Sequence, residues 1–376
     1  MTDQLPTRPR VVADLPILRR RHGELQIGLD PRHAAVVDGL PDTVVAAALR
    51  LTGHRTGEEV LAGLDPADRD AMRELLAALS DRGLLEDATS LSKPPPPRLA
   101  GDVAAARLRA VSAGQPPESH PIGRHKLAIA VHGDGRLAVA VACLLASAGV
   151  GWVHVAAAGR VRPEDTGTGY LHDDIGSPRR VAARRALHRV DATVRKVPFT
   201  AARAPDLVIL TDALVPPPEQ VNMLTAQAVP HLMVRVRDTT GIVGPLVVPG
   251  LTSCLHCADL HRCDRDACWP QLATQLAGHV RLTDLAGTHA TAAFAAAQAL
   301  DAAGWLRGLA DRPATCETSV ELDLRTATVR HREWSAHAAC SCGAARRQSP
   351  GQAYCSKVAA DPTDKLRQSG RDGDAS

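Results

Sequence analysis

The stretch KLAIAVHGDGRLAVAVACLLASAGVGWVHVAAAG, residues 126–159, decides the fold class. Residues 126–131 predict a buried strand, the next residues a glycine-rich turn, and the apolar run up to Ala148 a helix. A second strand is expected over 152–158. From here to about Trp334 strands and helices alternate, which predicts an α/β domain with a Rossmann-like parallel sheet.

The same stretch raises the question of a membrane span. Leu137 to Ala158 are 22 residues without Asp, Glu, Lys or Arg, enough to cross a bilayer. The run is rich in Ala and Val, contains His154, and is broken by Gly149-Val150-Gly151, so a buried helix and strand explain it better. The first residues show no signal-peptide pattern. We therefore expect a soluble, cytoplasmic protein with no membrane partner.

The glycine turn has the Gly-x-Gly-x-x-Ala pattern of a dinucleotide-type phosphate loop. Gly133 permits the tight turn, Gly135 lets a phosphate approach the backbone, and the following helix N-terminus favours an anion. A Rossmann-like turn without any nucleotide is the alternative. The carboxylate expected after the next strand is missing, since that strand ends in Ala156 to Gly159. This absence argues against a nicotinamide-dependent dehydrogenase.

The chain has 376 residues, enough for two or three domains, with 45% hydrophobic, 23% charged and 2% aromatic residues. So few aromatic residues disfavour a stacking platform for nucleic acids, and the net charge of +3 says little about partners. The predicted units are a small N-terminal domain over 1–88, a Pro-rich linker over 89–122, the Rossmann-like domain over 123–345, and a disordered tail over 346–376.

A hairpin and three helices are expected in the N-terminal domain. The hairpin joins 17–18 to 25–29, and the helices span 43–51, 56–64 and 66–82. The last has Asp65 as N-cap, a short strand after it, and an apolar face formed by Met72, Leu75, Leu76 and Leu79. This pattern suggests a winged-helix unit. Residues 1–95 hold 12 Lys and Arg against 15 Asp and Glu, whereas DNA binding needs excess cations. The unit is therefore expected to bind a peptide or protein, and no nucleic acid.

Nine cysteines without a secretory signal indicate reduced thiols and metal ligands. Two cysteine pairs, one with two residues between its members and one with a single residue between them, could together supply four thiolates to one tetrahedral zinc ion. A compact local set drawn from 254–268 and a redox dithiol at 340–342 are the alternatives. Cys143 is expected in the core, and Cys316 and Cys355 carry no pattern. The zinc candidates are Cys254, Cys257, Cys340 and Cys342, and the local alternative is Cys254, Cys257, Cys263 and Cys268.

Four segments follow one another along the chain: GVGWVHV (149–155), GSPR (176–179), DLVILTD (206–212) and GPLVVPG (244–250) with Cys254-x-x-Cys257. In this order they resemble the ThiF/MoeB-type activating-enzyme superfamily, over about 120–345. Within it, the chain is similar to the degenerate actinobacterial branch grouped with cyclodehydratase and leader-peptide-binding components of thiazole/oxazole-modified peptide pathways. The resemblance favours the zinc set that includes Cys340 and Cys342.

Active members of this superfamily adenylylate the C-terminus of a small carrier protein with ATP and magnesium, and the resemblance carries their site over incompletely. Gly133, Gly135 and Asp212 match the nucleotide loop and the magnesium-side acid. Arg179 stands where the family has a lysine. The ribose acid falls at Ala157 and a second acid at Gly159, and the family's arginine-bearing segment has become Thr166 to Tyr170.

These losses predict a pseudoenzyme, for which we expect a structural zinc and no ATP or magnesium chemistry. The preferred hypothesis is a non-catalytic scaffold that binds a peptide and presents it to a YcaO-type modifying enzyme. One alternative is an active ATP-dependent adenylyltransferase that acts on a small carrier protein through Arg179 and Asp212. A winged-helix regulator is the third hypothesis, and a homodimer is expected from the resemblance.

Overall fold

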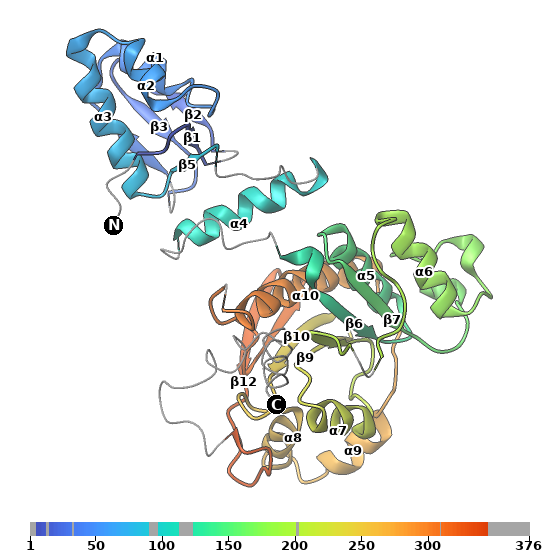
Figure 1. Cartoon of the computed structure of the whole chain (residues 1–376). Coiled ribbons are helices and arrows are strands. Elements are labelled where there is room, and N and C mark those ends of the chain that lie inside the picture. Colours follow the sequence, from blue (N-terminus) through green and yellow to red (C-terminus); the bar gives the residue numbers. More distant parts are fainter. Residues whose placement is uncertain are drawn as a thin grey trace, which may run out of the picture. The chain divides into compact units, whose positions relative to one another are not determined.

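The chain divides into two compact units, Met1–Ile122 and Gly123–Ser376 (Figure 1). The predicted tail over 346–376 and Cys355 lie outside the described residues, as does part of the predicted linker. Among the described residues, no helix combines the length and the apolar character needed to cross a membrane. The computed structural model describes residues 5–12, 15–31, 34–89, 97–112, 123–200, 203–308 and 310–344.

The N-terminal unit contains the predicted hairpin within a three-stranded antiparallel sheet, in the order β2-β3-β4, and a second pair formed by β1 and β5. The sequence did not predict β4, at one edge of the three-stranded sheet, or β1, which pairs with β5. The elements are β1 (Pro9–Val11), β2 (Ile17–Arg19), β3 (Leu25–Ile27), β4 (Ala35–Val37), α1 (Asp42–Ala48), α2 (Gly57–Ala62), α3 (Pro66–Asp81), β5 (Leu85–Asp87) and α4 (Ala100–Ser112).

Local sequence signals explain where these helices begin. Thr56 caps α2, because its Oγ1 accepts from the Glu59 amide at 3.1 Å while Glu59 Oε2 accepts from the Thr56 amide at 2.7 Å. Helix α3 begins at Pro66 as predicted, although the Asp65 side chain makes no capping bond. The apolar stripe of α3 is buried, as its spacing predicted.

The second unit is built on a seven-stranded sheet in the order β12-β11-β10-β9-β8-β6-β7. The four strands from β7 to β9 are parallel, as predicted, but β10, β11 and β12 run antiparallel to their neighbours. The prediction of a parallel sheet was therefore wrong for this half. Short turns join β9 to β10 and β11 to β12 as hairpins, and β11 pairs antiparallel with β10 after a connection that contains three helices. The strands are β6 (Ala128–His132), β7 (Trp152–Ala156), β8 (Leu207–Leu210), β9 (His231–Arg237), β10 (Thr240–Val247), β11 (Thr318–Asp323) and β12 (Thr328–Glu333).

Helices cover both faces of this sheet. Alternate side chains of β6 and β9, such as Ile129 and Val234, join the core under α5, α6 and α10, whereas Ala130 and Met233 pack with α7 and α8. The predicted core residue Cys143 is buried in α5. The helices are α5 (Arg136–Ser147), α6 (Arg179–Val190), α7 (Pro218–Ala226), α8 (Leu255–Cys263), α9 (Trp269–Leu276) and α10 (Leu285–Trp305).

Strand β6 lies between β7 and β8, so the chain leaves β6 toward one side and later returns on the other. This reversal places the carboxyl ends of β6 and β8 next to each other, where ligands bind in doubly wound folds. The two strand ends are joined by a hydrogen bond from the Thr211 amide to the His132 carbonyl oxygen at 2.8 Å. The glycine loop and Asp212 therefore meet at this edge.

Candidate functional site

Asp212 lies against the glycine loop. The Gly135 amide donates to Asp212 Oδ2 at 3.0 Å, and Thr211 Oγ1 lies 2.9 Å from the same oxygen. A side chain at Gly133 would collide with Thr211 and Asp212, so glycine is required there for the contact with the protein itself. Asp212 has a left-handed backbone with φ 68°, which turns its carboxylate back into the loop.

The carboxylate of Asp212 occupies the position that an anionic ligand would take. Gly135 is the N-cap of α5, where free amides and the helix dipole attract negative charge. Asp212 is buried, which raises its pKa to about 6, while hydrogen bonds from Gly135, Thr211 and Leu137 lower it. The loop that a phosphate would need is thus satisfied by a side chain of the protein.

Arg179 is also engaged within the protein. Its guanidinium donates to Asp165 Oδ2 at 2.7 Å and to the Ala158 carbonyl oxygen at 3.2 Å, and both Arg179 and Asp165 are buried. A Cβ at Gly159, where the family has an acid, would lie 3.1 Å from Arg179 Nη1. The arginine expected to hold a phosphate is therefore neutralised by a carboxylate of the preceding loop.

Sequence reasoning missed Asp165 as the partner of Arg179, because a pair 14 residues apart in a loop leaves no periodic signal. It also missed Tyr170, whose side chain is buried in the core and whose hydroxyl has no partner among the described residues. His132, at the end of β6, is half-buried. Its Nδ1 lies 2.7 Å from Gln220 Nε2, and burial lowers its pKa to about 4.

These residues do not fit ATP and magnesium. The positions of the two ribose-side acids are Ala157 and Gly159, and no arginine stands in 166–170. The remaining cation, Arg179, is paired with Asp165, and the remaining acid, Asp212, is bonded to the loop amides. Adenylylation requires cations placed around a phosphate, and the cation that the resemblance offers for this, Arg179, is engaged by Asp165 in this structure.

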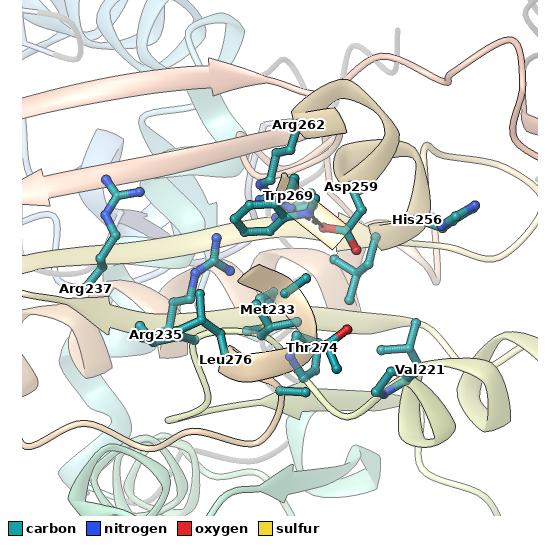
Figure 2. Close-up of a pocket in the computed structure, with 18 of the residues that line it drawn as sticks. Val221, Met233, Arg235, Arg237, His256, Asp259, Arg262, Trp269, Thr274 and Leu276 are labelled. Carbon is teal, nitrogen blue, oxygen red and sulfur yellow. Dashed lines mark hydrogen bonds and ion pairs between the residues drawn. The ribbon is translucent and has the colours of Figure 1, made fainter. Parts of the chain in front are cut away.

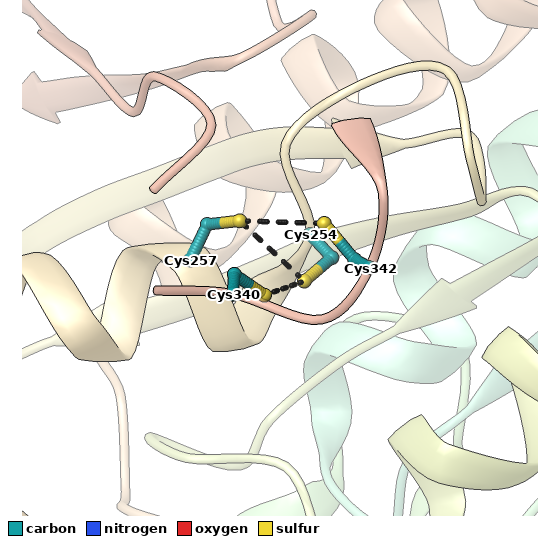
Figure 3. Close-up of side chains that lie close together, drawn as sticks. All are labelled: Cys254, Cys257, Cys340 and Cys342. Carbon is teal, nitrogen blue, oxygen red and sulfur yellow. Dashed lines mark hydrogen bonds between the residues drawn. The ribbon is translucent and has the colours of Figure 1, made fainter. Parts of the chain in front are cut away.

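The four cysteines predicted as zinc ligands lie together (Figure 3). Sγ of Cys254 is 3.8 Å from that of Cys257 and 3.6 Å from that of Cys340, and Sγ of Cys257 is 3.6 Å from that of Cys342. A tetrahedral zinc ion with Zn–S bonds near 2.3 Å requires sulfur atoms about 3.8 Å apart. The cluster therefore has the dimensions of a four-thiolate site.

The chemistry of these thiols also fits a bound cation. Burial raises the pKa of Cys254 and raises that of Cys340 to about 11, so thiolates need a positive ion beside them. Cys254 is the N-cap of α8 and Cys340 lies 86 residues away, so the cluster ties α8 to the segment after β12. Among the described residues, the local alternative with Cys263 and Cys268 does not assemble.

A second cluster of possible ligands, His261, Asp264 and His337, lies near this site. The Ala339 amide points at Nδ1 of His337 at 3.1 Å, which leaves the proton on Nε2, 3.0 Å from Asp264 Oδ2. His261 contacts Ser335 through Nε2. Hydrogen bonds therefore account for these three side chains without a metal.

Comparisons with known proteins bear on the fold. No family model matches the sequence, and no curated protein matches it. Among solved structures, E. coli MccB is similar with a TM-score of 0.63 and 14% identity over 92% of this chain and 99% of MccB. E. coli MccB with ATP gives 0.64 and 14% over 89% and 99%, and SeMet PaaA gives 0.61 and 18% over 85% and 98%. The predicted ThiF/MoeB-type resemblance is confirmed at the level of the fold.

Proposed function

We propose that this chain is a non-catalytic ThiF-like scaffold that binds a peptide and presents it to a modifying enzyme of the YcaO type. The observation that carries the proposal is Asp212, whose carboxylate is bonded to the Gly135 amide and fills the anion position of the glycine loop. The pairing of Arg179 with Asp165 adds to it. A chain that keeps this fold but uses its phosphate-handling groups internally has lost the means of activating a carboxylate.

Peptide binding is supported by the structural neighbours. MccB has been solved in complex with N-formylated MccA and with SeMet MccA. A formyl group and a selenomethionine both mark MccA as a polypeptide. We infer that the present chain uses the shared fold for a peptide as well. A homodimer, which the resemblance to activating enzymes implies, stays a prediction.

The N-terminal unit is the proposed peptide-binding element. We interpret it as a winged-helix-like domain, in which the sheet β2-β3-β4 leaves β2 and β4 at its edges. Val36 on β4 is 46% exposed and Leu18 on β2 is 38% exposed. A leader segment could add a strand to one of these edges through main-chain hydrogen bonds, with such side chains giving specificity.

The cysteine cluster is proposed to hold a structural zinc ion. Four thiolates would fill a tetrahedral ion and leave no open position for a substrate, so the metal would tie segments together and take no part in catalysis. Cys254, Cys257, Cys340 and Cys342 would hold it.

Two experiments test the scaffold proposal. Calorimetry with ATP and MgCl2, together with an ATP–pyrophosphate exchange assay, should show neither micromolar binding nor exchange. A reconstituted reaction of a YcaO-type enzyme with its precursor peptide should depend on this chain. The reaction should be lost with Val36→Asp and kept with Val329→Asp, which places the same charge on an exposed valine of the other unit. Micromolar ATP binding with exchange would overturn the proposal.

The second candidate function is an active adenylyltransferase. The observation that favours it is the likeness to MccB, which has been solved with ATP. This candidate predicts pyrophosphate exchange that Asp212→Asn abolishes while the fold and the metal content stay unchanged. Asp134→Asn, in the same loop, is the matched control and should leave such exchange in place.

A further inference from the structure

A cavity of about 650 Å³ lies on the face of the sheet that packs with α7 and α8. Its floor includes Met233 and Arg235 of β9, and its walls come from α7, α8 and α9 (Figure 2). The size is typical of a site for a small ligand or a short peptide segment. It is separate from the cysteine cluster, none of whose four members lines it.

The lining combines apolar walls with an excess of positive charge. Met233, Trp269 and Leu276 supply apolar surface. The charged lining residues are Arg235, Arg237, Arg262, Arg265 and Arg332, against Asp259 and Asp266. Five guanidinium groups against two carboxylates give the lining an excess of positive charge, which favours an anionic ligand.

The carboxylates near the cavity are already engaged with other groups. Asp259 Oδ1 accepts from Arg262 Nη1 at 2.7 Å and from the Trp269 indole N–H at 3.0 Å. Glu321, behind the cavity, lies 3.7 Å from Arg237 and 3.2 Å from Arg332. These acids therefore neutralise the arginines at the rim.

Arg235 is different from its neighbours. In the part of the chain that the structure describes, its backbone pairs with Ile242 of β10, but its side chain has no ion pair and no hydrogen bond. It rises from β9 toward the space beneath Trp269 and Arg262 (Figure 2). Burial, with the charges of Arg262 and Arg237, lowers its pKa to about 9. Arg235 is half-buried, and a guanidinium that loses part of its hydration is stabilised by a partner that replaces the lost hydrogen bonds.

We propose that this cavity binds a carboxylate of a peptide, with the Arg235 guanidinium as its partner and the apolar walls holding the neighbouring side chain. A planar guanidinium matches a carboxylate through two parallel hydrogen bonds. The carboxylate could be a peptide C-terminus or an acidic side chain. A phosphate carries up to two negative charges, so Asp259 and Asp266 in the same lining repel it more than they repel a singly charged carboxylate. The inference rests on the proposed peptide-binding function and names a second contact for that peptide.

The test uses calorimetry on the full chain with four probes. Acetyl-Leu-Leu offers a terminal carboxylate, acetyl-Leu-Glu-amide offers a side-chain carboxylate, acetyl-Leu-Leu-amide offers neither, and inorganic phosphate is the competing anion. At least one of the two carboxylate probes should bind, and the amide should not. Arg235→Gln should weaken that binding at least tenfold, while Arg330→Gln on the exposed strand β12 should leave it unchanged.

A stability measurement separates binding from a structural role. Arg235→Leu removes an unpaired charge from beside two other arginines, so its Tm should be unchanged or higher although binding is lost. A lower Tm would assign Arg235 to the fold and overturn the proposal. So would binding that ignores Arg235→Gln, the absence of any carboxylate binding, or tighter binding of phosphate. The Val36→Asp experiment decides the peptide-scaffold function independently of these results.

Discussion

Asp212→Asn tests whether the glycine loop is filled by the protein's own carboxylate. The pKa of Asp212 is raised from 3.8 to about 6, with burial as the largest cause. The folded state therefore favours the protonated form, and this preference stabilises the fold below pH 4 and is lost as the pH rises through 6. The difference between the two pKa values corresponds to about 3 kcal/mol of unfolding free energy.

Asparagine removes the buried charge and keeps the local geometry. Its Oδ1 can accept from the Gly135 amide, and asparagine tolerates the left-handed backbone that Asp212 adopts. We expect the unfolding free energy of Asp212→Asn, relative to the wild type, to rise by about 3 kcal/mol between pH 4 and pH 7. Below pH 4 the two proteins should differ only by a small constant.

Urea unfolding followed by tryptophan fluorescence measures this difference. All four tryptophans, the first of which is Trp152, lie in the second unit, so the signal reports on the unit that contains Asp212. Asp134→Asn is the control, because it removes a less buried carboxylate from the same loop. A difference that does not change with pH would refute the reasoning. So would a variant that becomes less stable than the wild type toward neutral pH, because the hydrogen bonds of the loop would then outweigh burial and stabilise the charged carboxylate.

Further predictions concern the metal cluster, a helix cap and the core. Cys340→Ser should lose one equivalent of zinc in metal analysis and lower the Tm of the second unit. Cys263→Ser should keep the zinc and the Tm of the wild type, and the reverse result would show that the ligand set is wrong. Thr56→Ala removes the capping box of α2 and should lower the unfolding free energy of the N-terminal unit by about 1 kcal/mol. Circular dichroism measures this, because the N-terminal unit has no tryptophan, and an unchanged free energy would mean that water replaces the cap. Leu145→Ala leaves a cavity in the core beneath α5 and should cost about 2–5 kcal/mol in urea unfolding, while Leu144→Ala, 37% exposed on the same helix, should cost much less.

The sequence alone determined the features that depend on local periodicity and spacing. The apolar strand, glycine turn and apolar helix at 126–148 predicted β6 and α5, and the spacing of apolar residues in α3 predicted its buried face. The ThiF/MoeB-type fold followed from segments in a fixed order. The cysteine spacing left two ligand sets open, and the resemblance to the activating-enzyme superfamily favoured the set that includes Cys340 and Cys342.

Only the tertiary structure decided what the charged residues do. Asp212 lies 77 residues from Gly135, and Arg235 is separated from Arg262 by β10, so no spacing rule predicts either contact. A sequence shows that an acid or an arginine is present, but its charge state and its availability depend on burial and on the partners that folding brings beside it. The structure placed the Asp212 carboxylate in the anion site, paired Arg179 with Asp165, and left Arg235 unpaired in a cavity. The proposed scaffold function rests on the first two outcomes and the proposed carboxylate site on the third, and each depends on which partners folding brings beside a charged group.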